Sequence, residues 1–245
     1  MAWLTETVAW LTDGANWSGP VGVPTLLAEH LRLTVVSLLV ACLVGLPVTV
    51  WLGHLGRGGV LAVQVSNMGR AVPVLAVLVL LVVAGPPFGF SDVTAVTAFT
   101  LFAVPPIVTN AYVGMREVDR GAVDAARGMG MTGWQVLRRV ELPLAAPLIL
   151  GGVRLAAVQL VATVSIAAIA AFGGLGRIVT RGFANQDVGE VVAGAFLIAV
   201  LALSTELVFE LLAGRVDPGR RVRRQARRRI AAADGRVPAA GVDVP

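Results

Sequence analysis

The chain has 245 residues, of which 56% are hydrophobic and 14% charged, and its mean hydropathy is +0.81. Soluble domains carry about 25% charged residues, so this composition excludes an ordinary soluble protein and predicts one embedded in a lipid bilayer. The net charge of +5 comes from the C-terminal end, because residues 215–245 hold 9 Arg and 3 Asp whereas residues 1–214 hold 11 Arg and 12 acidic residues.

The N-terminal segment, residues 1–28, is expected to be extracytoplasmic or to lie at the membrane interface. The first 31 residues contain no Lys or Arg, so the basic start of a cleaved signal peptide is missing and we expect the segment to be retained. Trp3, Trp10 and Trp17 recur every seven residues, which places them near one face of a helix suited to the interface. A loosely ordered leader is the alternative.

Five apolar segments follow, and they predict an all-α, polytopic membrane domain over residues 29–214. A membrane-spanning helix needs about 20 apolar residues. The segment 59–84 is interrupted by Arg70 and Pro73, so we predict an interfacial helix over 59–69 and a shorter span over 72–84. The five predicted spans are 33–52, 72–84, 93–115, 144–172 and 188–212.

Arginine placement predicts an N-out, C-in orientation, because loops rich in Lys and Arg stay cytoplasmic. With that orientation the cytoplasmic segments 54–70, 116–143 and 215–245 hold 16 Arg, and the external segments hold 3. The opposite orientation would reverse this ratio.

The predicted cytoplasmic loop 116–143 is long for a simple connection. Its Ala-rich start favours a helix, Gly128 and Gly130 permit a tight turn, and Thr132 can cap a second helix that runs to Arg139. We expect Pro143 to end that helix before the fourth span. The resulting helix-turn-helix is predicted to present a small apolar surface formed by Val123, Ala126, Met129 and Met131.

Two charged residues lie inside predicted spans at similar depth, Arg154 in the fourth and Glu206 in the fifth. Charge at membrane depth is costly and is usually paired or exposed to a polar cavity. We predict that Arg154 pairs with Glu206 or lines a polar pathway. The alternative is that Arg154 extends alone to the inner interface.

Gly173, Gly174 and Gly176 lie at the outer end of the fourth span, where they form either an external gate or a turn. Some side chains in or near the spans could contact a passing cation, although packing is the commoner role of such residues; they are Met68, Phe99, Phe102 and Tyr112.

The C-terminal segment, residues 215–245, is predicted to be a cytoplasmic tail. Arg220–Arg229 is interpreted either as attracted to anionic lipid or as a topology determinant without a further role. Residues 231–245 are expected to be disordered, and no nucleic-acid partner is expected.

No catalytic, metal or cofactor site is expected in this chain. Cys42 is the only cysteine, and His30 and His54 are the only histidines, so the sequence predicts neither an internal disulfide nor a Cys- or His-based metal site. Gly128–Gly133 matches G-x-G-x-x-G in letters, but a helical segment precedes it instead of the strand that a dinucleotide site requires. The chain has no lysine, so it cannot form a P-loop.

The loop 116–143 resembles the EAA loop, E-A-A-x3-G-x9-I-x-L-P, of binding-protein-dependent ABC importer permeases. Asp replaces Glu at 124 and Val replaces Ile at 140, which keeps the charge sign and the apolar character. The matching residues are Asp124, Ala125, Ala126, Gly130, Val140, Leu142 and Pro143.

Further segments, over about residues 28–213, resemble the osmoprotectant branch of that family, whose substrates include glycine betaine, choline, carnitine and proline betaine. These segments are His30–Thr34 before Ser37, Asn67 with Pro73, Pro105–Asn110, Gly128–Met131, and Gly173–Gly176 before Gly182. A permease for methionine or another small solute is the alternative, and a self-sufficient channel would leave the EAA loop unexplained.

The resemblance implies a type I ABC importer permease fold, a location in the bacterial inner or plasma membrane, and no enzymatic activity. It also implies three protein partners: a second permease chain, identical or different, a cytoplasmic ATPase dimer that binds ATP and Mg²⁺, and an extracytoplasmic substrate-binding protein. The ATPase would dock on 116–143, where Ala125 and Ala126 allow close approach and Asp124, Arg120 and Arg127 are candidates for polar contacts.

Overall fold

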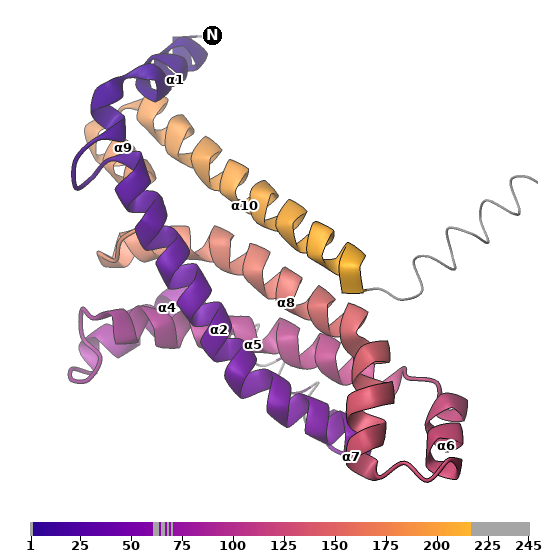
Figure 1. The fold of residues 1–245 in the computed structure, drawn as a ribbon. Helices are drawn as coiled ribbons and strands as arrows, with labels where there is room; N and C mark the ends of the chain where they lie inside the picture. The colour runs from indigo at the N-terminus through magenta and orange to yellow at the C-terminus, as the bar shows by residue number, and fades with distance from the viewer. Residues whose placement is uncertain (1, 61–63, 65–66, 68, 70, 217–245) are drawn as a thin grey trace, which may run out of the picture.

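The computed structural model describes residues 2–60, 64, 67, 69 and 71–216, and these residues form helices joined by turns, with no strand (Figure 1). Met68 and the tail 217–245 lie outside the described residues. The helices are α1 Ala2–Thr12, η1 Gly14–Trp17, α2 Val23–Leu55, α4 Val74–Val83, α5 Asp92–Arg116, α6 Arg120–Gly128, α7 Gly133–Val136, the π-helical turn η2 Leu137–Glu141, α8 Leu142–Val164, η3 Ser165–Ala170, α9 Gly176–Asn185 and α10 Val188–Val216.

Within the described part, four helical stretches are long and apolar enough to cross a membrane. They are Val23–Leu55, Asp92–Arg116, Gly133–Ala170 and Val188–Gly214. The other predicted span, 72–84, corresponds to α4, whose 10 residues rise about 15 Å, or about half of the hydrocarbon thickness.

Helix α2 packs along α5, α5 packs along α8, and α10 packs along both α8 and α9. Helices α2, α5 and α10 run in one direction and α8 in the other (Figure 1). The α6–α7 segment and the last described turns of α10 therefore lie at the same end of the molecule. We call this the coupling end, after the role predicted for residues 116–143, and the opposite end, where residues 171–176 join η3 to α9, the glycine end.

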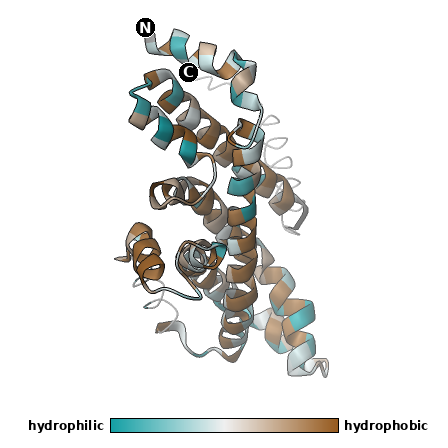
Figure 2. Cartoon of the chain, turned by 90° about the vertical axis from the view of Figure 1, so that its left-hand side faces the viewer, coloured by the Kyte–Doolittle hydropathy of each residue, from teal (hydrophilic) through white to brown (hydrophobic). Residues whose placement is uncertain are grey.

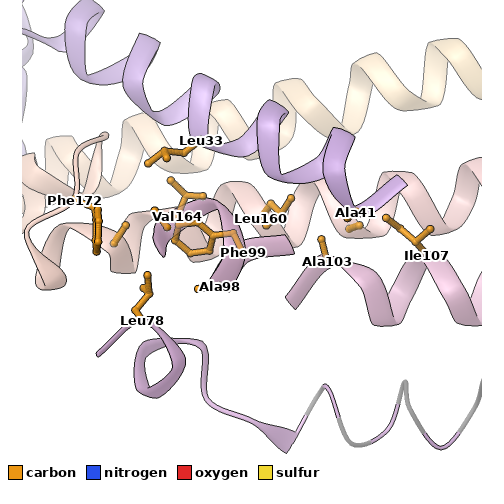
Figure 3. Packing of buried hydrophobic residues seen from close by; sticks show 13 residues of the cluster. Leu33, Ala41, Leu78, Ala98, Phe99, Ala103, Ile107, Leu160, Val164 and Phe172 are labelled. Carbon is orange, nitrogen blue, oxygen red and sulfur yellow. The ribbon is translucent and has the colours of Figure 1, made fainter. Parts of the chain in front are cut away.

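The main core lies between α2, α4, α5 and α8, where Phe99 and Leu160 are fully buried beside Leu78 (Figure 3). Glycines let the helix backbones approach closely, as is common between membrane helices. A Cβ on Gly53 would lie 2.5 Å from the Met115 Cβ. The outer surfaces of the long helices are largely hydrophobic (Figure 2), which suits lipid as their surroundings.

The local structure of the N-terminal segment differs from both the single helix and the loose leader considered for it. Helix α1 ends at Thr12 and Asp13 caps a separate 3-10 helix, so Trp17 does not share a helix with the other two tryptophans. The segment is nevertheless ordered, because α1 packs on α10, where Gly189 lies against the backbone of Glu6. The prediction of one three-tryptophan face and its alternative of a loose leader are both wrong.

Candidate functional site

The coupling segment, residues 116–143, begins with a helix whose start is fixed by a side chain. The Asp119 carboxylate accepts a hydrogen bond from the amide of Gly121 at 2.8 Å and so caps α6. Gly130 then turns the chain with φ of +85°, a conformation that favours glycine. Thr132 and Gln135 form the capping box that starts α7, each side chain accepting from the other residue's amide.

The second helix of this segment does not end at Pro143, and that prediction is wrong. The chain is helical without a break from Gly133 to Ala170. A π-helical turn, Leu137–Glu141, immediately precedes Pro143. The wider turn accommodates a proline, which cannot donate the regular backbone hydrogen bond. The second helix of the coupling segment and the next membrane span are therefore one continuous helix.

The coupling segment has an inner and an outer face, and the predicted apolar surface is divided between them. Val123 and Ala126, each 1% exposed, are buried against α5 and the π-helical turn, so their prediction as outward-facing residues is wrong. Met129 is 73% exposed and Met131 is half-buried. The structure adds Trp134, which is 62% exposed and which sequence reasoning missed.

The remaining residues of the EAA-like pattern fall on both faces. Asp124, Ala125 and Gly128 are exposed on α6. Val140 and Leu142 are half-buried and pack against the same core cluster as Val123. Pro143 is exposed at the start of α8.

A largely buried hydrogen-bonded pair ties the coupling segment to α2. The Nδ1 atom of His54, in the last turn of α2, contacts the Oε2 atom of Glu141. The His54 side chain is 12% exposed and that of Glu141 is 3% exposed. Sequence reasoning missed this pair, since the two residues lie 87 positions apart.

Arg154 and Glu206 contact each other within the spans. The Arg154 guanidinium on α8 forms an ion pair with the Glu206 carboxylate on α10. The two side chains are 35% and 38% exposed. Arg154 is therefore paired across two helices instead of extending alone to the interface.

The glycine end is fastened to α2 through backbone amides. The Glu29 Oε2 atom accepts from the amide of Gly174 at 3.0 Å, and His30 Nδ1 accepts from the amide of Leu175 at 3.3 Å. Because Nδ1 accepts, the proton of the neutral imidazole is on Nε2, which donates to the Val161 carbonyl at 2.9 Å. The glycine segment is thus a turn held by the chain's own α2.

Glycine is required in this turn by close packing. A Cβ on Gly176 would lie 2.0 Å from the carbonyl oxygen of Ser165, and one on Gly173 would lie 2.1 Å from Glu29 Oε2. Gly174 has φ of +100°.

The aromatic candidates for cation contact are packed. Phe99 is fully buried in the main core and Phe102 packs against the same cluster. Tyr112 is half-buried, close to Gly59. For Phe99 the packing alternative holds.

Residues 33–222 match the family described as the binding-protein-dependent transport system inner membrane component. The chain belongs to this family. It is therefore the permease subunit of an ABC importer, a multi-pass membrane protein and not an enzyme. Family membership implies an ATPase and a substrate-binding protein as partners.

Similarity to individual permeases covers most of the chain. The osmoprotectant import permease protein OsmY of Salmonella typhimurium is 35% identical over 192 residues, which are 78% of this chain and 80% of OsmY. The glycine betaine/carnitine/choline transport system permease protein OpuCB of Bacillus subtilis is 29% identical over 190 residues, 78% of this chain and 86% of OpuCB. An inward-facing structure of the MetNI methionine ABC transporter has a TM-score of 0.66 at 23% identity, covering 80% of this chain and 96% of that chain. This likeness confirms the type I importer permease fold.

Proposed function

We propose that this chain forms the translocation pathway of an ATP-driven importer of quaternary-ammonium osmoprotectants such as glycine betaine, choline, carnitine and proline betaine. The similarity to OsmY, named for osmoprotectant import, and to OpuCB, named for glycine betaine, carnitine and choline, carries this proposal. The methionine transporter supports only the shared fold, because its identity to this chain is 23%.

Uptake measurements test the substrate class. The permease, its ATPase and its binding protein are reconstituted in proteoliposomes, and uptake of radiolabelled glycine betaine, choline, carnitine and methionine is compared with and without internal ATP. The proposal expects ATP-dependent uptake of at least one quaternary-ammonium solute. Uptake of methionine alone would overturn it.

The coupling segment is proposed to dock on the ATPase dimer, which binds ATP and Mg²⁺. Its exposed residues support this role, because Met129 and Trp134 offer apolar contact area and the same segment exposes the charged residues Asp124, Arg120 and Arg127. Interfaces use large apolar anchors inside a polar rim in this way. Ala126 is assigned to internal packing, since it is buried within the chain.

Cross-linking tests the docking. With the native Cys42 replaced by Ala, Met129→Cys is expected to cross-link to the ATPase in the assembled transporter, whereas the buried Ala126→Cys is the matched control and is expected not to. Absence of any cross-link from Met129→Cys to the ATPase would contradict the docking.

A second permease chain, identical or different, is proposed to complete the pathway. The Arg154–Glu206 pair supports a polar lining, because ionisable groups in membrane spans usually face a bundle interior or a water-filled cavity. The predicted N-out, C-in orientation would place the coupling end on the ATPase side.

A further inference from the structure

The contact between His54 and Glu141 is largely enclosed by the protein, unlike a pair on the exposed surface. Glu141 is 3% exposed, and removing a carboxylate from water is costly unless a partner compensates it. The His54 ring also lies beside the Trp51 ring, with centroids 6.1 Å apart, and a Cβ on Gly133 would lie 3.7 Å from its Nε2 atom. The imidazole is therefore held between α2 and the start of α7.

Glu141 lies at the point where a movement of the coupling segment would pass into α8. Glu141 is the last residue of the π-helical turn. It lies in the chain between the residues proposed to dock on the ATPase and the span α8. Any displacement of α7 reaches α8 directly, because the helix 133–170 is continuous. Helix α2 comes from a distant part of the sequence and receives the displacement through side-chain contacts, among them the largely buried His54–Glu141 hydrogen-bonded pair.

The other histidine of the chain fastens the same two helices elsewhere. His30 donates to the Val161 carbonyl near the end of α8, far along α2 from His54. Helix α2 is thus attached to the helix 133–170 at both ends. By contrast, the Arg32–Asp92 pair joins α2 to α5, and its side chains are 60% and 62% exposed.

We propose that the His54–Glu141 pair is a positioning element that makes α2 move together with the coupling segment when the ATPase closes. The displacement then reaches two spans, and the work of the ATPase is converted into transport. This inference rests on the proposed docking of residues 116–143 on the ATPase.

The test measures uptake and ATP hydrolysis in the same proteoliposomes containing the complete transporter. In His54→Ala and Glu141→Gln, solute uptake per ATP hydrolysed is expected to fall about tenfold, a typical size for coupling between sites, while hydrolysis stays within about twofold of the unmodified transporter. Arg32→Ala and Leu55→Ala, an exposed residue next to His54 in sequence, are matched controls and are expected to keep the normal ratio. An unchanged ratio in both His54→Ala and Glu141→Gln would overturn the inference.

A cross-linked variant separates coupling from stability. A single substitution leaves one buried group without its partner, so the double variant His54→Cys/Glu141→Cys, in a Cys42→Ala background, removes both groups together. It is expected to be uncoupled, and a short bifunctional thiol reagent that joins the two cysteines is expected to restore the ratio. A cross-linked form no better coupled than the untreated form would contradict the role. If Met129→Cys forms no cross-link to the ATPase, the docking proposal fails, whereas a formed cross-link with unchanged coupling ratios rejects only this inference.

Discussion

The two ends of the helix 133–170 are fastened to α2 in different ways. At the coupling end the attachment is made by side chains, among them the His54–Glu141 pair and Val50, next to a surface of exposed residues. At the glycine end, α2 side chains bind the amides of Gly174 and Leu175, and Gly176 is pressed against the Ser165 backbone. A side-chain contact can adjust to a substitution when the side chain rotates. A backbone contact can adjust only if the chain itself moves. Substitutions at the glycine end should therefore reduce assembly, and those at the coupling end should reduce transport in assembled protein.

The largest effect is expected for Gly176→Ala. Its Cβ would lie 2.0 Å from the Ser165 carbonyl oxygen, so the backbone must move. We expect a loss of about 3 kcal/mol or more in stability, at the upper end of the range for overpacking, and little assembled transporter by size-exclusion chromatography. Gly151→Ala is the control, because the space around Gly151 is open. Normal assembly and melting of Gly176→Ala would show that the glycine end is not rigid.

A smaller effect is expected for His30→Ala. The substitution leaves the Val161 carbonyl and the Leu175 amide without the buried imidazole, and we expect a total loss of about 2 kcal/mol, within the range for an unsatisfied buried group. Glu29→Gln is the milder comparison, because its amide oxygen can still accept from Gly174 and the loss should be about 1 kcal/mol or less. Thermal unfolding of the purified permease complex measures both. Equal melting of the two variants would remove the special role of His30.

The smallest stability effect is expected between α8 and α10. Removing either Arg154 or Glu206 leaves an unpaired charge in a span, whereas removing both does not, so the losses should be non-additive by about 1 kcal/mol. A double-mutant cycle with Arg154→Ala and Glu206→Ala, followed by both unfolding and uptake, measures the coupling. Additive losses would contradict direct pairing.

Features that depend on local sequence could be predicted. Apolar length located the long helices, and the Thr132 cap follows from residues three positions apart. Arg154 and Glu206 could be matched because a charge in an apolar segment needs a partner and both lie at similar depth.

Other features were not accessible, for separate physical reasons. His30 and Glu29 act on backbone amides 145 positions away, and only the packing of α2 on the end of α8 brings them together. Pro143 indicates a helix end by its residue type. The preceding π-helical turn, which lets the helix continue, leaves no simple sequence signal. The EAA-like pattern identifies residues without assigning faces, although the three-residue spacing of Val123 and Ala126 could have placed both on the inward side.

Sided labelling of Met129→Cys tests the central claim most directly, namely that the exposed face of residues 116–143 meets the ATPase on the inner side of the membrane. In a Cys42→Ala background, a membrane-impermeant thiol reagent is applied to right-side-out and inside-out vesicles lacking the ATPase, with the buried Ala126→Cys as the control. The account predicts labelling of Met129→Cys in inside-out vesicles, protection when the ATPase is added, and no labelling of Ala126→Cys in native protein. Labelling of Met129→Cys only in right-side-out vesicles would contradict it.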